Sequence, residues 1–310
     1  MKKVIFALAA IGLLLTGCGG ATLDKSDDSD TKGAVAEKKP EELVVGVSIS
    51  TLNNPFFVSV RDGINELAEE NKTKTIISDA QNDSSKQSND IDDLIQQQVD
   101  ILLINPVDSS AIQPAVEAAN QANIPVIALD RSSDGGDVMS LVASDNVKGG
   151  EMAAQFLIET LGENAKIVQL EGIPGASATR ERGEGFEKGA KDKLEIVDSQ
   201  SADFDRAKGL TVMENILQAN PDIDAVFAQN DEMALGAIEA LKAANKTDVI
   251  VIGFDGNDDA IKSVENGDLT ATVAQQPTEM GKLALQAAYD YFSGKTVDEK
   301  IDSPLELVKK

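Results

Sequence analysis

The sequence predicts an α/β fold made of two lobes, each a doubly wound parallel sheet. From Leu43 onward, short runs of β-branched residues alternate with amphipathic helical patterns, which is typical of repeated βα units. An apolar run ends at Asn105 and another at Asp130, and the same spacing of 25 residues separates Asn230 from Asp255. Because small ligands bind outside the carboxyl ends of parallel strands, this repeat indicates two similar lobes that face one ligand.

The individual elements follow from local pattern in a chain of 310 residues, a length that favours two domains. Strands are expected at residues 43–48, 74–78, 101–104, 126–129, 141–143, 165–170, 195–199, 225–228, 249–254 and 270–274. Apolar spacing predicts helices after Phe57, around Ile91, and at residues 110–123, 148–161, 182–192, 206–220, 232–244, 258–266 and 278–292. Pro277 and Gly162 lie where helices commonly begin and end. We expect the chain to change lobe near Asp145 and to cross back near Gln276.

Composition excludes several classes of function. With 53 acidic and 28 basic residues, the chain is too acidic to favour binding of nucleic acid, or of anionic lipid by the folded body. It contains no histidine, which removes the usual general base, the Ser-His-Asp and Cys-His systems, and every histidine-containing zinc site. Chemistry based on carboxylates or lysine remains open.

The N-terminus has the pattern of an export signal. Lys2 and Lys3 precede an apolar run from Val4 to Leu15, which is too short to span a membrane but long enough for a secretory signal. The run ends in Leu-Thr-Gly-Cys, which resembles the bacterial lipobox, in which the cysteine is acylated and becomes the first residue. Cys18 is the sole cysteine, so it forms no intramolecular disulfide. The alternative is a chance cysteine after an ordinary signal peptide.

The segment after Cys18 is predicted to be a tether. Residues 19–42 contain no aromatic residue and little apolar content, so burial cannot offset the entropy cost of ordering them. We therefore expect a disordered link that holds the folded body close to the outer face of a cytoplasmic membrane, through lipid on Cys18.

Aromatic and polar residues follow the first predicted strand. Ser50 and Asn54 lie in a loop that leads into the adjacent Phe56 and Phe57. Consecutive helical residues point about 100° apart, so one or both rings are free to face a pocket; the alternative is that both pack as core. An aromatic face suits the C–H side of a sugar ring, and hydroxyl and amide groups bond sugar hydroxyls.

Later strand ends supply further candidates. They are Asn105, Asp130 and Arg131 in the first half, and Arg182, Phe204, Asn230, Asp255 and Gln275 in the second. Each has an ordinary alternative, such as a surface ion pair, a helix-start charge or a core ring. Taken together they follow successive strands, which favours one binding site between the lobes.

Several of these segments together resemble the D-ribose-binding proteins of bacterial ABC importers. The resemblance runs from Leu43 to the C-terminus and rests on STLNNPFFVS, ILLINP, NQANIPVIALDR, ASDN, TRERGEGF, ADFDR, AVFAQNDEMALGA and GFDG. It implies the type I periplasmic-binding-protein fold, with two lobes joined by a three-strand hinge. The implied domains are a signal peptide at 1–17, a lipidated tether at 18–42, an N-terminal lobe at 43–144 plus 276–304, and a C-terminal lobe at 145–275 plus 305–310.

The resemblance also implies roles for the candidate residues. Phe56, Phe57 and Phe204 would sandwich a sugar ring. Its hydroxyls and ring oxygen would be bonded by Ser50, Asn54, Asn105, Asp130, Arg131, Arg182, Asn230, Asp255 and Gln275. The implied partners are D-ribose or a similar monosaccharide, an ABC permease with its cytoplasmic ATPase, and the membrane through Cys18. No cofactor, metal or nucleic acid is expected, and we expect a monomer.

Three other functions compete with this one. The ligand could be another monosaccharide, such as allose, galactose or xylose, or a furanose-like signalling molecule. A sugar-responsive transcription regulator would need an N-terminal helix-turn-helix, where this chain has an export signal and an acidic tether. A glycosidase could use Asp130 and Asp255, but Arg131 and Arg182 are expected to keep both carboxylates ionised, which leaves no general acid.

Overall fold

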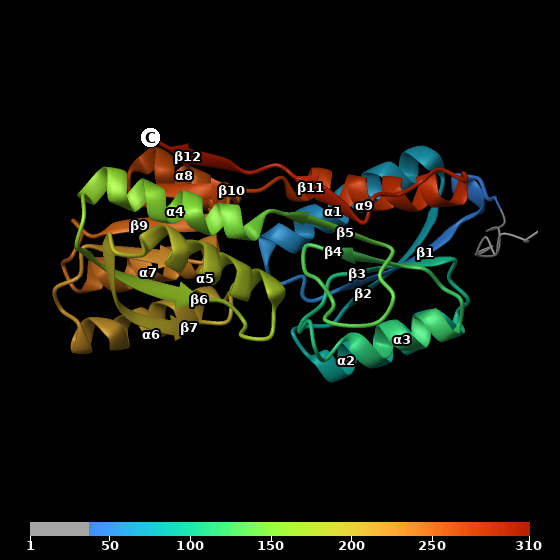
Figure 1. Cartoon of the computed structure of the whole chain (residues 1–310), viewed down its shortest axis with the longest axis horizontal. Coiled ribbons are helices and arrows are strands. Elements are labelled where there is room, and N and C mark those ends of the chain that lie inside the picture. Colours follow the sequence, from blue (N-terminus) through green and yellow to red (C-terminus); the bar gives the residue numbers. More distant parts are fainter. Residues whose placement is uncertain (1–36) are drawn as a thin grey trace, which may run out of the picture. The chain divides into compact units, whose positions relative to one another are not determined.

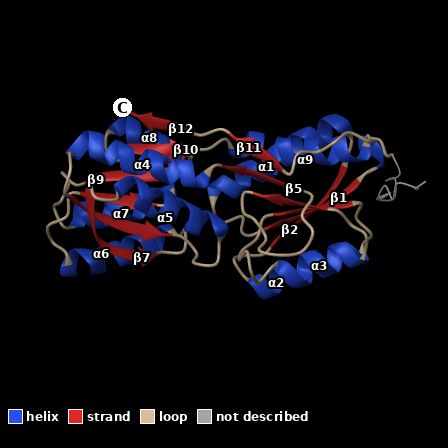
Figure 2. Cartoon of the chain, viewed as in Figure 1, coloured by secondary structure: helices blue, strands red, loops and turns tan. Residues whose placement is uncertain are grey.

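The computed structural model describes residues 37–310, in which two six-stranded sheets form the centres of two lobes (Figures 1 and 2). The predictions at residues 1–36, which include Cys18, lie outside the described residues. Sheet A has the order β11-β5-β4-β3-β1-β2, formed by β1 (Val44–Ile49), β2 (Lys74–Asp79), β3 (Ile101–Ile104), β4 (Val126–Leu129), β5 (Ser140–Ser144) and β11 (Lys300–Ser303). Sheet B has the order β12-β10-β9-β8-β6-β7, formed by β6 (Ala165–Glu171), β7 (Leu194–Ser201), β8 (Ala225–Ala228), β9 (Ile250–Asp255), β10 (Ala271–Ala274) and β12 (Glu306–Lys309). The predicted fold class is confirmed.

Helices cover both faces of each sheet. In the first lobe, α1 (Pro55–Asn71) and α9 (Pro277–Phe292) pack on one face of sheet A, while α2 (Ser84–Gln96) and α3 (Gln113–Gln121) pack on the other. A short 3-10 helix at Pro40–Glu42 precedes β1, and the Lys38 N–H donates to the Phe292 carbonyl at 3.1 Å, so the chain is ordered from Lys38 onward, although the disordered link was predicted to continue to residue 42. In the second lobe, α4 (Asn146–Leu161) and α5 (Ser177–Ala190) cover one face of sheet B, and α6 (Arg206–Ala219), α7 (Asp231–Ala243) and α8 (Asp258–Asn266) cover the other.

The central strands are buried on both faces, which explains why their sequences are apolar throughout. In β3, Ile101 and Leu103 belong to the core beneath α1 and α9, while Leu102 and Ile104 belong to the core beneath α2 and α3. Successive side chains of a strand point to opposite faces, so a sheet covered by helices twice needs an unbroken apolar run.

The chain passes between the lobes at three places. It leaves β5 for α4, leaves β10 for α9, and leaves β11 for β12. β12 pairs antiparallel with β10, so sheet B departs from the all-parallel prediction at one edge. The reason is directional: β11 ends at the side facing the second lobe, so the strand that continues into sheet B runs against its neighbours.

Three element predictions differ from the structure. Helix α5 begins at Ser177, five residues before the predicted start at Arg182, because the arginines resembled helix-start charges. Helix α3 begins at Gln113 rather than residue 110, because Pro114 has no N–H and is accommodated in a first turn. Strands β11 and β12 were not predicted, because their short sequences mix charged and apolar residues at the sheet edges. Pro277 and Gly162 do begin α9 and end α4, as predicted.

Helix α4 crosses α5 through a pair of glycines that let the two backbones touch. A Cβ built on Gly150 would overlap the carbonyl oxygen of Arg182, and one on Gly185 would overlap the carbonyl oxygen of Val147. The same reciprocal arrangement joins α1 to α9 through Gly63 and Gly281. The α4–α5 contact fixes the position of the turn that carries Arg182.

We predict that Gly185→Ala destabilises the second lobe despite the better helix propensity of alanine. The added methyl group must push apart two close-packed backbones, and such overpacking costs about 1–3 kcal/mol, against a propensity gain of about 1. Gly183→Ala in the same helix is the matched control, because its nearest neighbour is a side-chain atom, Gln229 Nε2, at 3.3 Å. Denaturant unfolding of both variants measures the difference; equal stability of the two would contradict the packing argument.

Candidate functional site

A small cavity lies between the lobes, at the carboxyl ends of strands from both sheets. Its empty volume is about 220 Å³. The lining residues are Asn54, Phe56, Phe57, Asp130, Arg131, Ala178, Arg182, Phe204, Asn230 and Asp255. Nine of the twelve residues predicted to bind ligand are therefore in this lining. The cavity is the place where the duplicated strand ends of the two lobes meet.

The start of helix α1 supplies the aromatic wall from the first lobe. The Asn54 side chain caps the helix, because its Oδ1 accepts a hydrogen bond of 2.9 Å from the Phe56 N–H. The rings of Phe56 and Phe57 pack edge to face, with centroids 5.2 Å apart. Both rings are buried in the core under α1 and also line the cavity, so the two interpretations that the sequence left open are both true.

Strand β4 of the first lobe ends in a buried ion pair. Asp130 has a φ of 64°, a left-handed conformation that turns the chain sharply at the strand end. Arg131 Nε lies 3.6 Å from Asp130 Oδ2, and Arg131 Nη1 donates a 3.0 Å hydrogen bond to the Pro106 carbonyl. The guanidinium carbon lies 5.1 Å from the ring centroid of Phe57 and 5.2 Å from that of Phe204. Arg131 thus contacts aromatic groups from both lobes.

The second lobe contributes a second buried ion pair. Arg182 Nη1 lies 3.5 Å from Asp255 Oδ1, while Nε donates to Asn146 Oδ1 at 2.9 Å and Nη1 donates to the Gln229 carbonyl at 2.7 Å. The guanidinium carbon lies 3.8 Å from the ring centroid of Phe254. An ion pair, two hydrogen bonds and an aromatic ring therefore hold this arginine at the cavity wall.

Phe204 and Asn230 complete the wall from the second lobe. Phe204 follows β7 with a φ of 59°, and its carbonyl accepts a 3.3 Å hydrogen bond from Asn230 Nδ2. Asn230 also caps α7, accepting the Met233 N–H at 2.9 Å. Asn230 thus connects the loop that carries Phe204 to the start of a helix.

Three predicted residues lie one layer behind the lining. Asn105 Nδ2 donates to the Leu129 carbonyl at 3.0 Å and lies 3.5 Å from Asp130 Oδ2, while its Oδ1 accepts the Ser50 N–H at 3.1 Å. Gln275 Nε2 donates to Asp255 Oδ1 at 2.9 Å. Ser50, Asn105 and Gln275 therefore hold the lining residues in place. Ala178 is the one lining residue that the sequence did not suggest; it lies one turn before Arg182, and a correct start for α5 would have revealed it.

Several buried polar atoms in and just behind the lining have no hydrogen-bond partner in the protein. They are Asp130 Oδ1, Arg131 Nε, Ser50 Oγ and Gln275 Oε1. A buried polar atom without a partner costs about 1–3 kcal/mol, so such a group gains when a polar ligand supplies one. The set contains both acceptors and donors, which matches a ligand rich in hydroxyl groups.

Burial dominates the titration of the two carboxylates. It raises the pKa of Asp130 above its usual value, although Arg131 and Arg182 act in the opposite direction. Burial likewise raises the pKa of Asp255 well above its usual value, against the attraction of Arg182. The arginines lower both pKa values, as the sequence suggested, but burial outweighs them, so their presence does not by itself exclude a general acid.

Outside the cavity, direct hydrogen bonds join the two lobes. The loop after β3 meets the loop before α5: Ser109 N donates to the Gly175 carbonyl at 2.9 Å, and Ser177 N donates to Ser109 Oγ at 3.1 Å. Ser132 N, after β4, donates to Ser177 Oγ at 3.0 Å. An exposed ion pair between Arg180 and Asp134 lies beside them. We call this group of contacts, centred on Ser109, Gly175 and Ser177, the interlobe latch.

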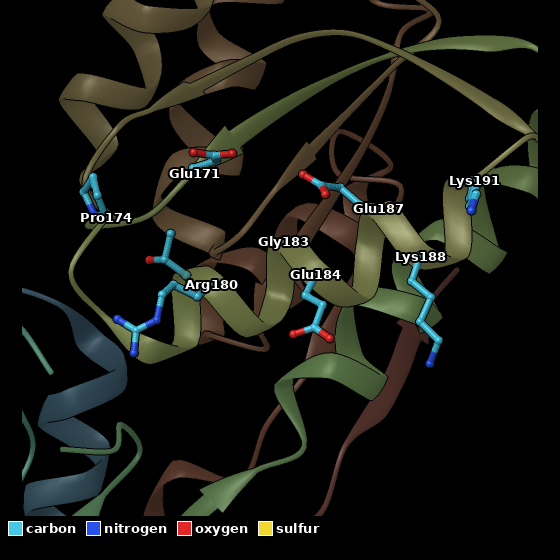
Figure 3. Close-up of a pocket in the computed structure, with 9 residues that line it drawn as sticks. Glu171, Pro174, Arg180, Gly183, Glu184, Glu187, Lys188 and Lys191 are labelled. Atoms are coloured by element: carbon cyan, nitrogen blue, oxygen red, sulfur yellow. The ribbon is translucent and has the colours of Figure 1, made fainter. Parts of the chain in front are cut away.

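Two other pockets differ from the cavity in character. One adjoins it between the lobes, shares Asn54, Phe57, Arg131 and Phe204 with its lining, and has an empty volume of about 480 Å³. The larger one, of about 1180 Å³, lies over α5 and is lined mostly by charged side chains such as Arg180, Glu184 and Lys188 (Figure 3). Size alone would favour the pocket over α5, but buried, converging polar groups mark the small cavity as the site.

No group of three or more potential ligand residues suited to a metal ion occurs within residues 37–310. Among the helices of that same range, none is long and apolar enough to cross a membrane.

Comparison with known proteins identifies the family. The periplasmic binding protein domain family matches residues 45–296. The ribose import binding protein RbsB of Bacillus subtilis is 57% identical over 99% of this chain and 99% of its own length. The RbsB protein of Haemophilus influenzae is 48% identical, covering 89% of this chain and 94% of its own length.

Comparison with solved structures indicates the same family. An ABC transporter solute binding protein from Mycobacterium smegmatis with bound glycerol has a TM-score of 0.83 and 36% identity, covering 86% of this chain and 94% of that one. A solute binding protein from Bacillus halodurans with bound myo-inositol has a TM-score of 0.81 and 35% identity, covering 90% of this chain and 96% of that one. The chain therefore belongs to the periplasmic binding protein family, a family of extracytoplasmic solute-binding proteins rather than enzymes.

Proposed function

We propose that this protein captures D-ribose in the cavity between its lobes and delivers it to the permease of an ABC importer. The observation that carries the proposal is the convergence of two buried Asp–Arg pairs and three phenylalanines, from both lobes, on one cavity. Such a wall offers apolar faces for a sugar ring and charge-assisted hydrogen bonds for its hydroxyls.

The identities of the relatives favour ribose as the ligand. Relatives named for ribose import are 48–57% identical to this chain, whereas a neighbour solved with myo-inositol and one solved with D-allose are 35% and 30% identical. Another monosaccharide, such as allose, is the second candidate.

Roles for the individual residues follow from their places. Phe56 and Phe57 are proposed to cover one face of the sugar ring and Phe204 the other. Asp130 and Asp255 would accept hydrogen bonds from hydroxyls, and their arginine partners would donate to the same or neighbouring oxygens. Ser50, Asn105 and Gln275 would act from behind, by bonding the sugar directly or by orienting the residues that do.

The latch gives this capture a mechanism of closure. The sugar would bridge the cavity walls, while Ser109, Gly175 and Ser177, which are not in the cavity lining, join the lobes directly. Ligand favours closure only to the extent that its contacts exist in the closed state alone, and latch bonds add a constant bias to that equilibrium. The closed pair of lobes is the form that we propose a permease recognises.

The predicted anchoring completes the proposal. Lipid on Cys18 and a tether that ends before Lys38 would keep the protein at the outer face of the cytoplasmic membrane, as a monomer beside the permease and its cytoplasmic ATPase. Mass spectrometry of the protein isolated from membranes tests this: a lipid-modified N-terminal cysteine supports it, and a soluble chain cleaved without modification contradicts it.

A sugar panel tests the ligand directly. Ligand that binds only the native state raises its stability by RT ln(1 + [L]/Kd), about 2.7 kcal/mol at a hundredfold excess over Kd. We expect D-ribose to raise the melting temperature of residues 37–310 more than allose, galactose, xylose or myo-inositol at equal concentration. A larger shift with allose would favour the second candidate, and no shift with any sugar would refute the site.

Arg182→Ala should weaken ribose binding by about a hundredfold. Its loss leaves buried Asp255 without a cationic partner and removes a charged donor, an effect of about 1.5–3 kcal/mol. Lys188→Ala, on the exposed side of the same helix, is the matched control and should bind normally. Calorimetry measures both affinities; an unchanged Kd for Arg182→Ala would remove this residue from the site.

Gly175→Ala should weaken ribose binding although residue 175 does not line the cavity. A Cβ there would overlap the Asp108 carboxylate across the lobe interface, which opposes closure but leaves each lobe intact. Asp108→Ala removes the obstructing atoms, so the double variant should recover much of the affinity. Calorimetry on both single variants and the double variant tests this. Equal losses in Gly175→Ala with and without Asp108→Ala would show that the clash is not the cause.

A further inference from the structure

Asp231 lies outside the cavity lining yet is fully buried beside it. It is the first residue of α7, directly after Asn230. Its Oδ2 accepts two backbone hydrogen bonds, from Gly256 N at 2.7 Å and from Asn257 N at 2.8 Å. Its Oδ1 accepts a third, from Thr272 Oγ1 at 2.7 Å. One carboxylate therefore connects the ends of β8 and β9 with strand β10.

The two backbone groups belong to the turn that carries Asp255. Asp255 has a φ of 120°, which residues with a side chain rarely adopt, and Gly256 has a φ of 78°. Such a backbone costs of order 1–3 kcal/mol per strained residue and persists only where the surroundings enforce it. The peptide N–H groups that follow Asp255 point at the Asp231 carboxylate, which holds this backbone together with the 2.8 Å hydrogen bond from the Gln275 N–H to the Asp255 carbonyl.

The surroundings of Asp231 leave room for its carboxylate and favour a negative charge there. An ideal Cβ at residue 253 would overlap Asp231 Oδ1, so only glycine in β9 leaves room for the carboxylate. Its place at the N-terminus of α7 puts it in the favourable field of the helix dipole. Burial nevertheless raises its pKa to about 7, opposed by the hydrogen bonds from Thr272 and the turn. The carboxylate is thus held in a position that costs free energy.

The first lobe shows how specific this arrangement is. Its position equivalent to Asp231 is Pro106, after Asn105, and its position equivalent to Gly256 is Arg131. There the connection between the two strand ends runs the other way, from the Arg131 guanidinium to the Pro106 carbonyl. Both lobes tie the same two strand ends together, but only the second lobe uses a carboxylate to do so.

We infer that Asp231 is a positioning residue for sugar binding, which aims the Asp255 carboxylate into the cavity by holding the turn at residues 255–257. This inference rests on the proposed role of Asp255 in binding ribose. Asp231 itself touches no ligand, so its effect passes through the turn.

Substitution at Asp231 tests the inference by calorimetry with D-ribose, on chains shown by circular dichroism to be folded at the assay temperature. Asp231→Ala should weaken binding tenfold or more, because the turn loses both acceptor contacts. Asp231→Asn keeps one neutral oxygen for the two N–H groups, so it should bind severalfold more weakly than the natural protein but more tightly than Asp231→Ala. Affinity equal to that of the natural protein in Asp231→Ala, or in Asp231→Asn if the alanine variant does not fold, overturns the inference.

A control and a double variant separate positioning from plain loss of stability. Asp224→Ala removes another carboxylate that accepts a strand N–H, that of Lys166. Asp224 lies at the amino end of β8, away from the cavity, so this variant should leave affinity unchanged. In an Asp255→Ala background, Asp231→Asn should no longer change affinity, because the carboxylate that Asp231 positions is absent. Equal losses in both backgrounds would overturn the inference. If the natural protein and Asp255→Ala bind ribose alike, the proposed role of Asp255 fails instead.

Discussion

The buried pairing of Asp130 with Arg131 and of Asp255 with Arg182 is the constraint on which the rest of the site depends. Four ionisable groups removed from water carry a desolvation cost that their mutual attraction offsets only with good geometry and additional hydrogen bonds. The structure supplies these bonds through backbone carbonyls, capping asparagines and aromatic faces. The raised pKa of both aspartates shows that the compensation is incomplete. Hydroxyl groups of a sugar are the kind of partner that such under-satisfied charges can still use.

The duplicated framework explains how two lobes can hold one asymmetric ligand. Both lobes place an asparagine at the end of one strand and an aspartate at the end of the next, and in both a charged side chain helps to tie those ends together. In the first lobe that side chain is a cation that also enters the cavity, Arg131; in the second it is an anion kept behind the wall, Asp231. The cation of the second lobe comes from a helix instead, as Arg182. Similar scaffolds therefore present different hydrogen-bonding edges to the two sides of the cavity.

The sequence predicts those parts of the fold and site that depend on local pattern. β3, β4, β8 and β9 are readable because strands buried on both faces need unbroken apolar runs, and the carboxyl ends of such strands locate Asn105, Asp130, Asn230 and Asp255. The edge strands β11 and β12 lack such runs, and the arginines obscured the start of α5. The antiparallel direction of β12 depends on its arrival from the other lobe, which no local pattern encodes. For the same reason the sequence could not separate the lining residues from Ser50, Asn105 and Gln275 behind them. The sequence shows the arginines that lower the pKa of the aspartates, but it does not show the depth of burial that raises it.

The hydrogen bonds between the lobes must not be so strong that they close the protein without ligand. The latch bonds of Ser109 and Ser177 favour the closed arrangement whether or not sugar is bound, so very strong latch bonds would close the protein without ligand. A permease that recognises the closed form could then not distinguish loaded from empty protein. A ligand shifts the closed population only through the difference between its affinities for the two states. The unsatisfied groups of the cavity act in the opposite direction. If the lobes close without a hydroxylated ligand, Asp130 Oδ1 and Arg131 Nε are buried without a hydrogen-bond partner. The same atoms that would bind the sugar therefore oppose closure in its absence, and this opposition is what would couple the closed state to the presence of ligand.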